Sequence, residues 1–100
     1  MNKLFNNLDW SIESLTQIKE YKKNHDSKSL KKIWELIFDI DVNGNMAGKG
    51  NPEHLIHGLK DYYSRRIDEI NRLIYILKDG VIYICSCKGH YDIIKFTFKK

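Results

Sequence analysis

The chain has 100 residues, of which 42% are hydrophobic and 30% are charged. This length holds a single domain over residues 1–100, and the balance is typical of a folded globular protein rather than of a disordered one. One proline and six glycines exclude collagen-like and low-complexity structures. The longest apolar runs, 73–77 and 81–85, are far shorter than the ~18 residues of a membrane span. Residues 1–7 lack the apolar segment of a secretory signal, so we expect a cytoplasmic protein.

The charge is mildly positive. Seventeen basic residues stand against thirteen acidic ones, which gives a net charge of +4 and favours a polyanionic partner without requiring one. All three arginines, Arg65, Arg66 and Arg72, lie within eight positions. A guanidinium holds phosphate through two parallel hydrogen bonds, whereas lysine provides only a point charge. By itself, however, the cluster fits an ordinary solvated basic strand equally well.

The first half of the chain predicts a strand and two helices. Residues 4–10 suit a short strand, although two adjacent asparagines weaken it. Ser11 is a suitable N-cap for the helix that follows, with Glu13 near its positive end. A polar segment, 22–26, separates this helix from a second one. Apolar residues at helical spacing define two predicted core stripes: Ile12, Leu15, Ile18 and Tyr21 in the first helix, and Leu30, Ile33, Trp34 and Ile37 in the second.

The second half predicts a long loop and then a sheet. Residues 43–52 contain three of the six glycines and the only proline, which indicates a loop. The pattern G-x-x-x-x-G-K-[ST] is absent, so a nucleotide-binding P-loop is excluded. We expect a short helical turn over 53–59 and strands over 62–67, 72–77 and 81–87. Asp79-Gly80 predicts a type I′ hairpin between the last two strands. The tail, 92–100, alternates with strand period and predicts an extended C-terminal extension packed along the domain.

This order of elements predicts an α+β fold. Two N-terminal helices pack on one face of a mainly antiparallel sheet of four to five strands. The opposite face of the sheet is then left for a ligand.

Two cysteines, Cys85 and Cys87, offer little chemistry. At i, i+2 in a strand they point to one face, in a geometry unsuited to an unstrained disulfide. With His90 they form C-x-C-x-x-H, whose three potential ligands are fewer than a closed zinc site needs. We therefore expect reduced, half-buried cysteines and no metal or other cofactor.

Glu53, Arg66, Arg72 and His90 form a chemically coherent set. Cleavage of RNA by its own 2′-OH needs a base for the 2′-OH proton, a cation for the charge on phosphorus and an acid for the leaving 5′-oxygen. A glutamate, two arginines and a histidine supply all three without a metal. Spacing alone does not show that they converge.

Four ordered blocks resemble a known family. They read GKGNPEHLIH over 48–57, YSRRI over 63–67, RLIY over 72–75 and CKGHY over 87–91. Together they resemble the Txe/YoeB branch of the RelE superfamily, and a weaker, collinear similarity begins at Asp9-Trp10-Ser11. Members of this family are toxins of bacterial toxin–antitoxin pairs, ribosome-associated endoribonucleases that cut mRNA. The resemblance therefore implies a RelE-like α+β fold and a nuclease that inhibits translation.

The resemblance also implies roles for individual residues. Glu53 matches the general base, His90 the general acid, and Arg72 the arginine that stabilises the scissile phosphate. The residues implied to contact RNA or phosphate are Lys49, Arg65, Arg66 and Tyr91, of which Arg65 is the weaker of the arginine pair. The implied partners are a cognate antitoxin with a disordered segment that folds on binding, and mRNA in the ribosomal A site. A homodimer stays open, and no membrane is expected.

The sequence also departs from the family pattern. Ile70 and Asn71 stand where the family often has an acid and a histidine, so no role transfers to these positions. Glu53, His54 and His57 superficially resemble a metal-binding spacing, but two histidines on a helix surface are the better interpretation.

Alternatives to the nuclease remain. One is a noncatalytic RNA-binding or antitoxin-binding module on the same fold, which has no need of a base and an acid together. A DNA-binding subunit lacks support, since no recognition helix with clustered basic residues is predicted. A net charge of +4 is small for tight autonomous binding to mRNA, which favours dependence on a ribosome that presents the strand.

Overall fold

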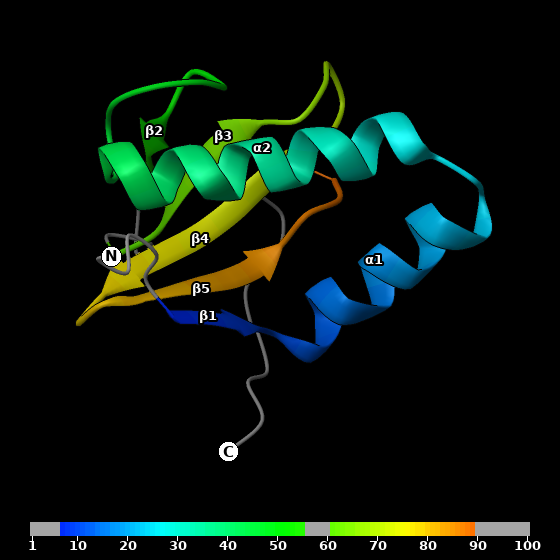
Figure 1. The fold of residues 1–100 in the computed structure, drawn as a ribbon, viewed down its shortest axis with the longest axis horizontal. Coiled ribbons are helices and arrows are strands. Elements are labelled where there is room, and N and C mark those ends of the chain that lie inside the picture. The colour runs from blue at the N-terminus through cyan, green and yellow to red at the C-terminus, as the bar shows by residue number, and fades with distance from the viewer. Residues whose placement is uncertain (1–6, 56–60, 90–100) are drawn as a thin grey trace, which may run out of the picture.

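The computed structural model describes residues 7–55 and 61–89 (Figure 1). In chain order the elements are β1 (Asn7–Trp10), α1 (Ile12–Lys23), α2 (Ser27–Asn43), β2 (Glu53–His54), β3 (Tyr63–Arg66), β4 (Arg72–Lys78) and β5 (Val81–Ser86). This arrangement confirms the predicted α+β fold. Within the part of the chain that the structure describes, no helix is long and apolar enough to cross a membrane.

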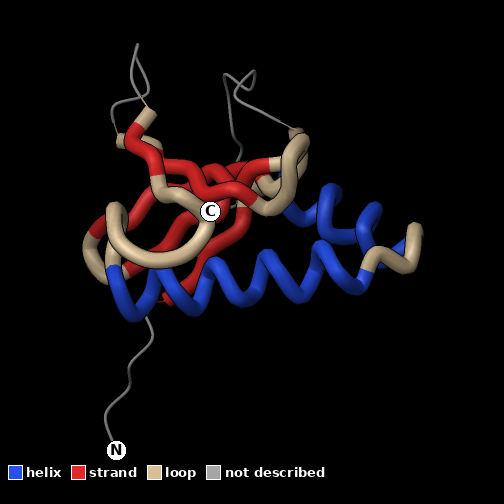
Figure 2. Tube along the Cα trace, turned by 90° about the horizontal axis from the view of Figure 1, so that it is seen from above, coloured by secondary structure: helices blue, strands red, loops and turns tan. Residues whose placement is uncertain are grey.

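The five strands form one mixed sheet in the order β1-β5-β4-β3-β2. Strands β2 to β5 pair antiparallel with their neighbours, and β1 pairs parallel with β5 at the opposite edge. The two helices connect β1 to the antiparallel part and lie on the same side of the sheet (Figures 1 and 2). The main core fills the space between this face and the helices. Its buried members are Tyr21, Ile33, Leu36, Ile37, Ile40, Ile67, Leu73, Tyr75, Ile82, Ile84 and Cys87.

The N-cap of α1 agrees with the prediction, but part of the predicted core stripes does not. Ser11 caps α1 and accepts from the Ser14 N–H, as predicted. Ile12, Leu15 and Trp34, however, are about half exposed, at 46%, 45% and 52%. For Ile12 and Leu15 the reason is that α1 approaches β5 through a serine: the fully buried Ser14 hydroxyl donates to the carbonyl of Ile84 in β5 at 3.2 Å. Apolar spacing cannot anticipate a helix face centred on a small polar residue.

A β-bulge corrects the prediction for the cysteines. Ile74 is paired with Ser86, whereas Tyr75 is paired with Ile84, so Cys85 is an extra residue in β5. An extra residue reverses the alternation of side chains along the strand. Cys85 therefore packs in a second cluster while Cys87 joins the main core, and the two side chains do not share a face.

The segment before β3 also differs from the prediction. Glu53 and His54 form strand β2, paired with β3, and not the start of a helical turn. This short edge strand forms because it pairs with β3, a partner outside the segment itself that local propensity does not reveal. The rest of the predicted turn (56–60), residues 4–6 of the first predicted strand and the tail (92–100) lie outside the described residues. The type I′ hairpin agrees with positive φ at both Asp79 (53°) and Gly80 (76°).

Candidate functional site

Four polar residues of the candidate site share the face of the sheet that points away from the helices. Glu53 is paired with Ser64 across β2 and β3, and Arg66 is paired with Arg72 across β3 and β4. Residues paired across strands point to the same face, and so do alternate residues along one strand. The register therefore places Glu53, Arg66 and Arg72, three members of the chemical set named from the sequence, on one face of the sheet together with Ser64.

Arg72 is the most firmly held of them. Its side chain is only 6% exposed, and its Nε donates to the Ser64 hydroxyl at 3.0 Å. Its Nη2 lies 3.4 Å from Glu53 Oε1 and 3.4 Å from the carbonyl of Asn51. Sequence reasoning missed Ser64, because a serine inside a strand carries no signal until the register of β3 and β4 is known.

Glu53 and Arg66 are exposed beside this buried guanidinium. The Glu53 side chain is 54% exposed, so its ion pair with Arg72 can rearrange when another anion arrives. Arg66 is exposed and lies directly opposite Arg72, and like charges in that position destabilise a sheet. An anion bound between the two guanidiniums would offset this repulsion.

The chain also brings the segment that leads to His90 to the same place. The backbone N–H of Arg72 donates to the carbonyl of Gly89 at 3.0 Å, and the N–H of Gly89 donates to Asn71 Oδ1 at 2.8 Å. His90 and Tyr91 themselves lie outside the described residues. Chain continuity nevertheless makes residue 90 the direct neighbour of a residue that is bonded to Arg72.

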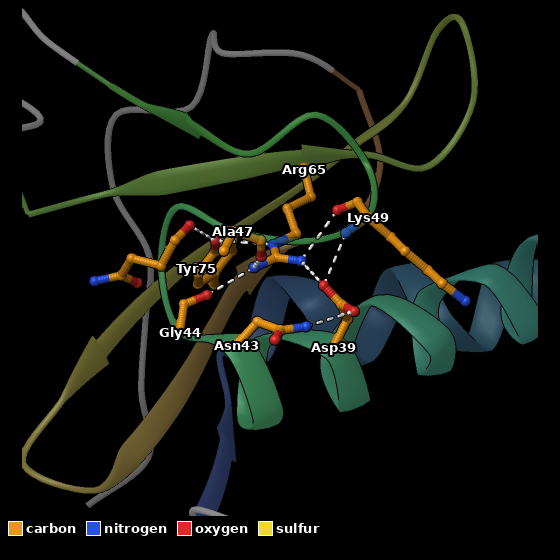
Figure 3. A network of polar contacts seen from close by, with 8 residues as sticks. Asp39, Asn43, Gly44, Ala47, Lys49, Arg65 and Tyr75 are labelled. Atoms are coloured by element: carbon orange, nitrogen blue, oxygen red, sulfur yellow. Dashed lines mark hydrogen bonds and ion pairs between the residues drawn. The ribbon is translucent and has the colours of Figure 1, made fainter.

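Arg65 corrects the sequence interpretation. Its side chain is fully buried on the helix side of the sheet, and all five of its N–H donors are occupied inside the protein (Figure 3). The acceptors are Tyr75 Oη, Asp39 Oδ2 and the carbonyls of Lys49, Gly44 and Ala47. No donor remains for a phosphate, so Arg65 has a structural position rather than the expected RNA contact.

The ionisation of Asp39 and Tyr75 suits this network. Partial burial alone would raise the pKa of Asp39, but the N–H of Lys49 and the Arg65 guanidinium outweigh it and hold the pKa below its usual value. Burial raises the pKa of Tyr75, although Arg65 opposes the shift, so its hydroxyl stays protonated and donates to the Asn45 carbonyl at 2.9 Å.

The loop that Arg65 holds requires glycine at two positions. Gly48 has a φ of +105°, and a Cβ there would lie 1.8 Å from Asp39 Oδ2. Gly50 has a φ of +82°, and a Cβ there would lie 2.7 Å from Leu36 Cδ2. Both conformations are strained for other residues, and both contacts are too close for a side chain. The loop thus lies flat against α2, while the exposed Lys49 side chain extends away from the network (Figure 3).

Among the described residues, the remaining candidates form neither a metal centre nor a reactive thiol. His54 lies on the other face from Glu53 and stacks on Tyr63, with ring centroids 4.6 Å apart, so the predicted helix-surface position is wrong; His57 lies outside the described residues. Across 7–55 and 61–89, no three His, Cys, Asp or Glu residues are placed to hold a metal ion. Burial raises the pKa of both cysteine thiols to about 12, which leaves them protonated and inert.

The face that carries the site is only partly open. Leu55, Ile74 and Cys85 form a second buried cluster on it, with Tyr62 and Ile76 partly buried against them. The prediction that this whole face is left for a ligand is therefore too broad. The exposed polar part of this face is the end of the sheet where the side chains of Glu53 and Arg66 lie.

Comparison with known proteins agrees with this architecture. A family model described as YoeB-like toxin of bacterial type II toxin-antitoxin system matches residues 10–91. Toxin YoeB of Escherichia coli K12 is 42% identical over 84 residues, which cover 84% of this chain and 98% of that toxin. Toxin YoeB of Synechocystis is 38% identical over 70 residues, 70% of this chain and 80% of that toxin.

Solved structures give the same result. The YoeB dimer from Staphylococcus aureus superposes with a TM-score of 0.82 at 43% identity, covering 89% of this chain and all of that one. The YoeB–YefM toxin–antitoxin heterotetramer from the same species gives 0.79 at 44% identity, covering 86% and 98%. The fold and these matches define a toxin of a bacterial type II toxin–antitoxin system. More specifically, the chain belongs to the YoeB toxin family, which confirms the resemblance seen in its sequence motifs.

The buried ion pair predicts a large effect of Asp39→Ala. The substitution leaves the Arg65 charge buried without its counter-ion, which should lower the free energy of unfolding by about 3–5 kcal/mol. Urea denaturation followed by circular dichroism measures this change. Glu35→Ala, on the exposed side of the same helix, is the control and should change stability by less than about 0.5 kcal/mol. Similar stabilities for the two variants would contradict the central place given to Arg65.

The close approach of the loop predicts a second difference. Gly48→Ala should lower the free energy of unfolding by about 1–3 kcal/mol more than Gly80→Ala, because only the first places a Cβ against Asp39. Gly80 also has positive φ, but no atom lies within 4 Å of the point that a Cβ would occupy there, so it controls for backbone strain. Equal losses in urea denaturation would show that steric contact with Asp39 is unimportant.

Proposed function

We propose that this toxin is a ribosome-dependent mRNA endoribonuclease that uses metal-independent general acid–base catalysis. The observation that carries the proposal is the placement of a buried Arg72 guanidinium beside the exposed Glu53 carboxylate, with the chain entering His90 from a residue bonded to Arg72. A base, a phosphate-binding cation and an acid are the three groups that this cleavage needs.

In the proposed reaction Glu53 accepts the proton of the 2′-OH, and the freed oxygen attacks the adjacent phosphorus. The bond from phosphorus to the 5′-oxygen breaks, and His90 donates a proton to that oxygen. The products are a 2′,3′-cyclic phosphate and a 5′-hydroxyl end, with one proton gained by Glu53 and one lost by His90. Arg72 stabilises the charge on the non-bridging oxygens during attack.

The surrounding residues suit the binding of a phosphate backbone. Ser64 and Asn51 hold Arg72 so that little side-chain freedom is lost when phosphate binds. Arg66 adds an exposed guanidinium opposite Arg72, and Lys49 adds an exposed ammonium on the rigid loop. Tyr91, next to the proposed acid, is assigned to positioning the substrate from the family resemblance alone.

The proposed partners follow from the same chemistry and from the relatives. A net charge of +4 gives only weak electrostatic attraction to RNA. We therefore infer that the ribosome binds the mRNA and aligns it in the A site for the toxin. This substrate places the toxin in the cytoplasm. The Staphylococcus aureus YoeB structures contain a complex with the antitoxin YefM and a dimer. We assign this toxin a cognate antitoxin on that basis.

The first test of the mechanism is Glu53→Gln. Loss of the base should reduce single-turnover cleavage of mRNA on programmed ribosomes by about 10²–10⁴-fold. Glu69→Gln, an exposed acid in the turn after β3, is the control and should retain the wild-type rate. The RNA ends should be a 2′,3′-cyclic phosphate or 3′-phosphate and a 5′-hydroxyl. A 5′-phosphate product or full activity of Glu53→Gln would exclude the proposed chemistry, and an inactive wild type would favour the noncatalytic module.

The second test is Arg72→Lys. Lysine keeps the charge but lacks the planar guanidinium that donates to Ser64 from one nitrogen and presents parallel donors to phosphate, so cleavage at saturating ribosome should stay severely impaired. Arg66→Lys, which is exposed and keeps its charge, should lose much less of that rate. Thermal melting checks that both variants fold. A nearly active Arg72→Lys would show that charge alone is sufficient at this position.

A further inference from the structure

Hydrogen bonds of the Asp68 side chain, including one to the side chain of Asn71, close the turn between β3 and β4. Asp68 Oδ1 accepts from the backbone N–H groups of Ile70 and Asn71, at 2.8 Å and 2.7 Å. Asp68 Oδ2 accepts from Asn71 Nδ2 at 3.1 Å. The backbone carbonyl of Asn71 in turn accepts from the backbone N–H groups of Ile67 and Asp68. This turn therefore holds the Asn71 side chain in one place.

The other end of the Asn71 amide contacts a distant segment. Its Oδ1 accepts from the N–H of Gly89 at 2.8 Å, while the neighbouring Arg72 N–H donates to the carbonyl of Gly89 at 3.0 Å. Two consecutive residues, 71 and 72, thus hold both polar groups of Gly89.

Chemistry fixes the orientation of this amide. A carboxylate accepts and a backbone N–H donates, so Nδ2 must face Asp68 and Oδ1 must face Gly89. The reversed amide would set two acceptors against each other at Asp68 and two donors against each other at Gly89. Burial alone would raise the pKa of Asp68, but hydrogen bonds from Asn71 and Ile70 and the charge of Lys28 outweigh it and hold the pKa below its usual value. The carboxylate consequently stays ionised and keeps the amide in this orientation at neutral pH.

We propose that Asn71 is a positioning residue for the cleavage reaction. Its side-chain carbonyl fixes Gly89, and thereby the point at which the chain enters His90, relative to the guanidinium of Arg72. This inference rests on the proposed function, because it assigns Asn71 the placement of the proposed acid. Asn71 needs no contact with RNA for this task.

The test compares Asn71→Leu with the wild type. Leucine has a similar size but can neither accept from Gly89 nor donate to Asp68. The single-turnover rate at saturating ribosome should fall by about tenfold or more, since small displacements of a catalytic group have effects of this order. The dissociation constant for the ribosome should stay within about twofold, because a positioning residue acts on the chemical step. Ile70→Ala is the matched control: this residue of the same turn is 72% exposed, and both quantities should be unchanged.

A reciprocal exchange separates positioning from general damage to the turn. In the double variant Asp68→Asn/Asn71→Asp, residue 68 still accepts from the two backbone N–H groups and now donates to residue 71. The carboxylate at 71 still accepts from Gly89, so the exchange should recover the rate to within about threefold of wild type, whereas Asn71→Leu should not. Amide hydrogen exchange of Gly89 should be slow in the wild type and in the exchange variant, and fast in Asn71→Leu.

The outcomes are distinct. A wild-type rate in Asn71→Leu together with fast exchange at Gly89 overturns the inference and leaves the proposed nuclease intact. Failure of the exchange variant to recover the rate, with Gly89 still protected, also overturns it. A wild type that does not cleave ribosome-bound mRNA removes the proposed function, and the role assigned to Asn71 falls with it.

Discussion

The buried contact between Arg65 and Asp39 is the interaction on which the rest of the structure depends. It joins α2, the glycine-rich loop, β3 and, through Tyr75, β4. Such a pair is stable only where every remaining donor is satisfied, and three loop carbonyls complete the set. The same hydrogen bonds that satisfy the arginine fix the loop, and the loop leads directly into Pro52 and Glu53. The buried Arg65 on the helix side of the sheet therefore helps to fix the position of Glu53, the proposed base, whose side chain lies on the other side.

The two adjacent arginines have different surroundings because side chains alternate between the two faces of a strand. Arg65 points toward the helices and is fully buried, whereas Arg66 points away and is exposed. Both have the chemistry of a phosphate ligand, and composition cannot distinguish them. The register of β3 and β4 distinguishes them. Arg66 is paired with Arg72, so these two guanidiniums lie on one face, whereas Arg65 is paired with the buried Leu73 on the other. The positive charge at the site thus comes from β3 and β4, while the neighbouring arginine stabilises the scaffold.

Sequence patterns predict the parts of this fold that local interactions determine. The Ser11 cap, the Asp79-Gly80 hairpin and the order of the helices and of the strands other than β2 all follow from local chemistry. The parts that could not be predicted depend on the exact pairing of strands: strand β2, the bulge at Cys85 and the contact of Ser64 with Arg72. For the same reason the sequence could propose Glu53 and Arg72 as a chemical set but could not bring them together.

The candidate site combines a fixed side chain, Arg72, with an exposed one, Glu53. This combination suits the proposed substrate, an mRNA strand presented by the ribosome. Arg72 is fixed by Ser64 and by its place in the sheet, so its guanidinium is already oriented before any phosphate arrives. Glu53 lies at the exposed edge strand and is held to Arg72 by an ion pair of little strength in water. A phosphate that binds Arg72 would displace this pairing and leave the carboxylate to accept a proton. In the proposed mechanism the phosphate takes the position of this ion pair, so binding of RNA and release of the proposed base would be the same event.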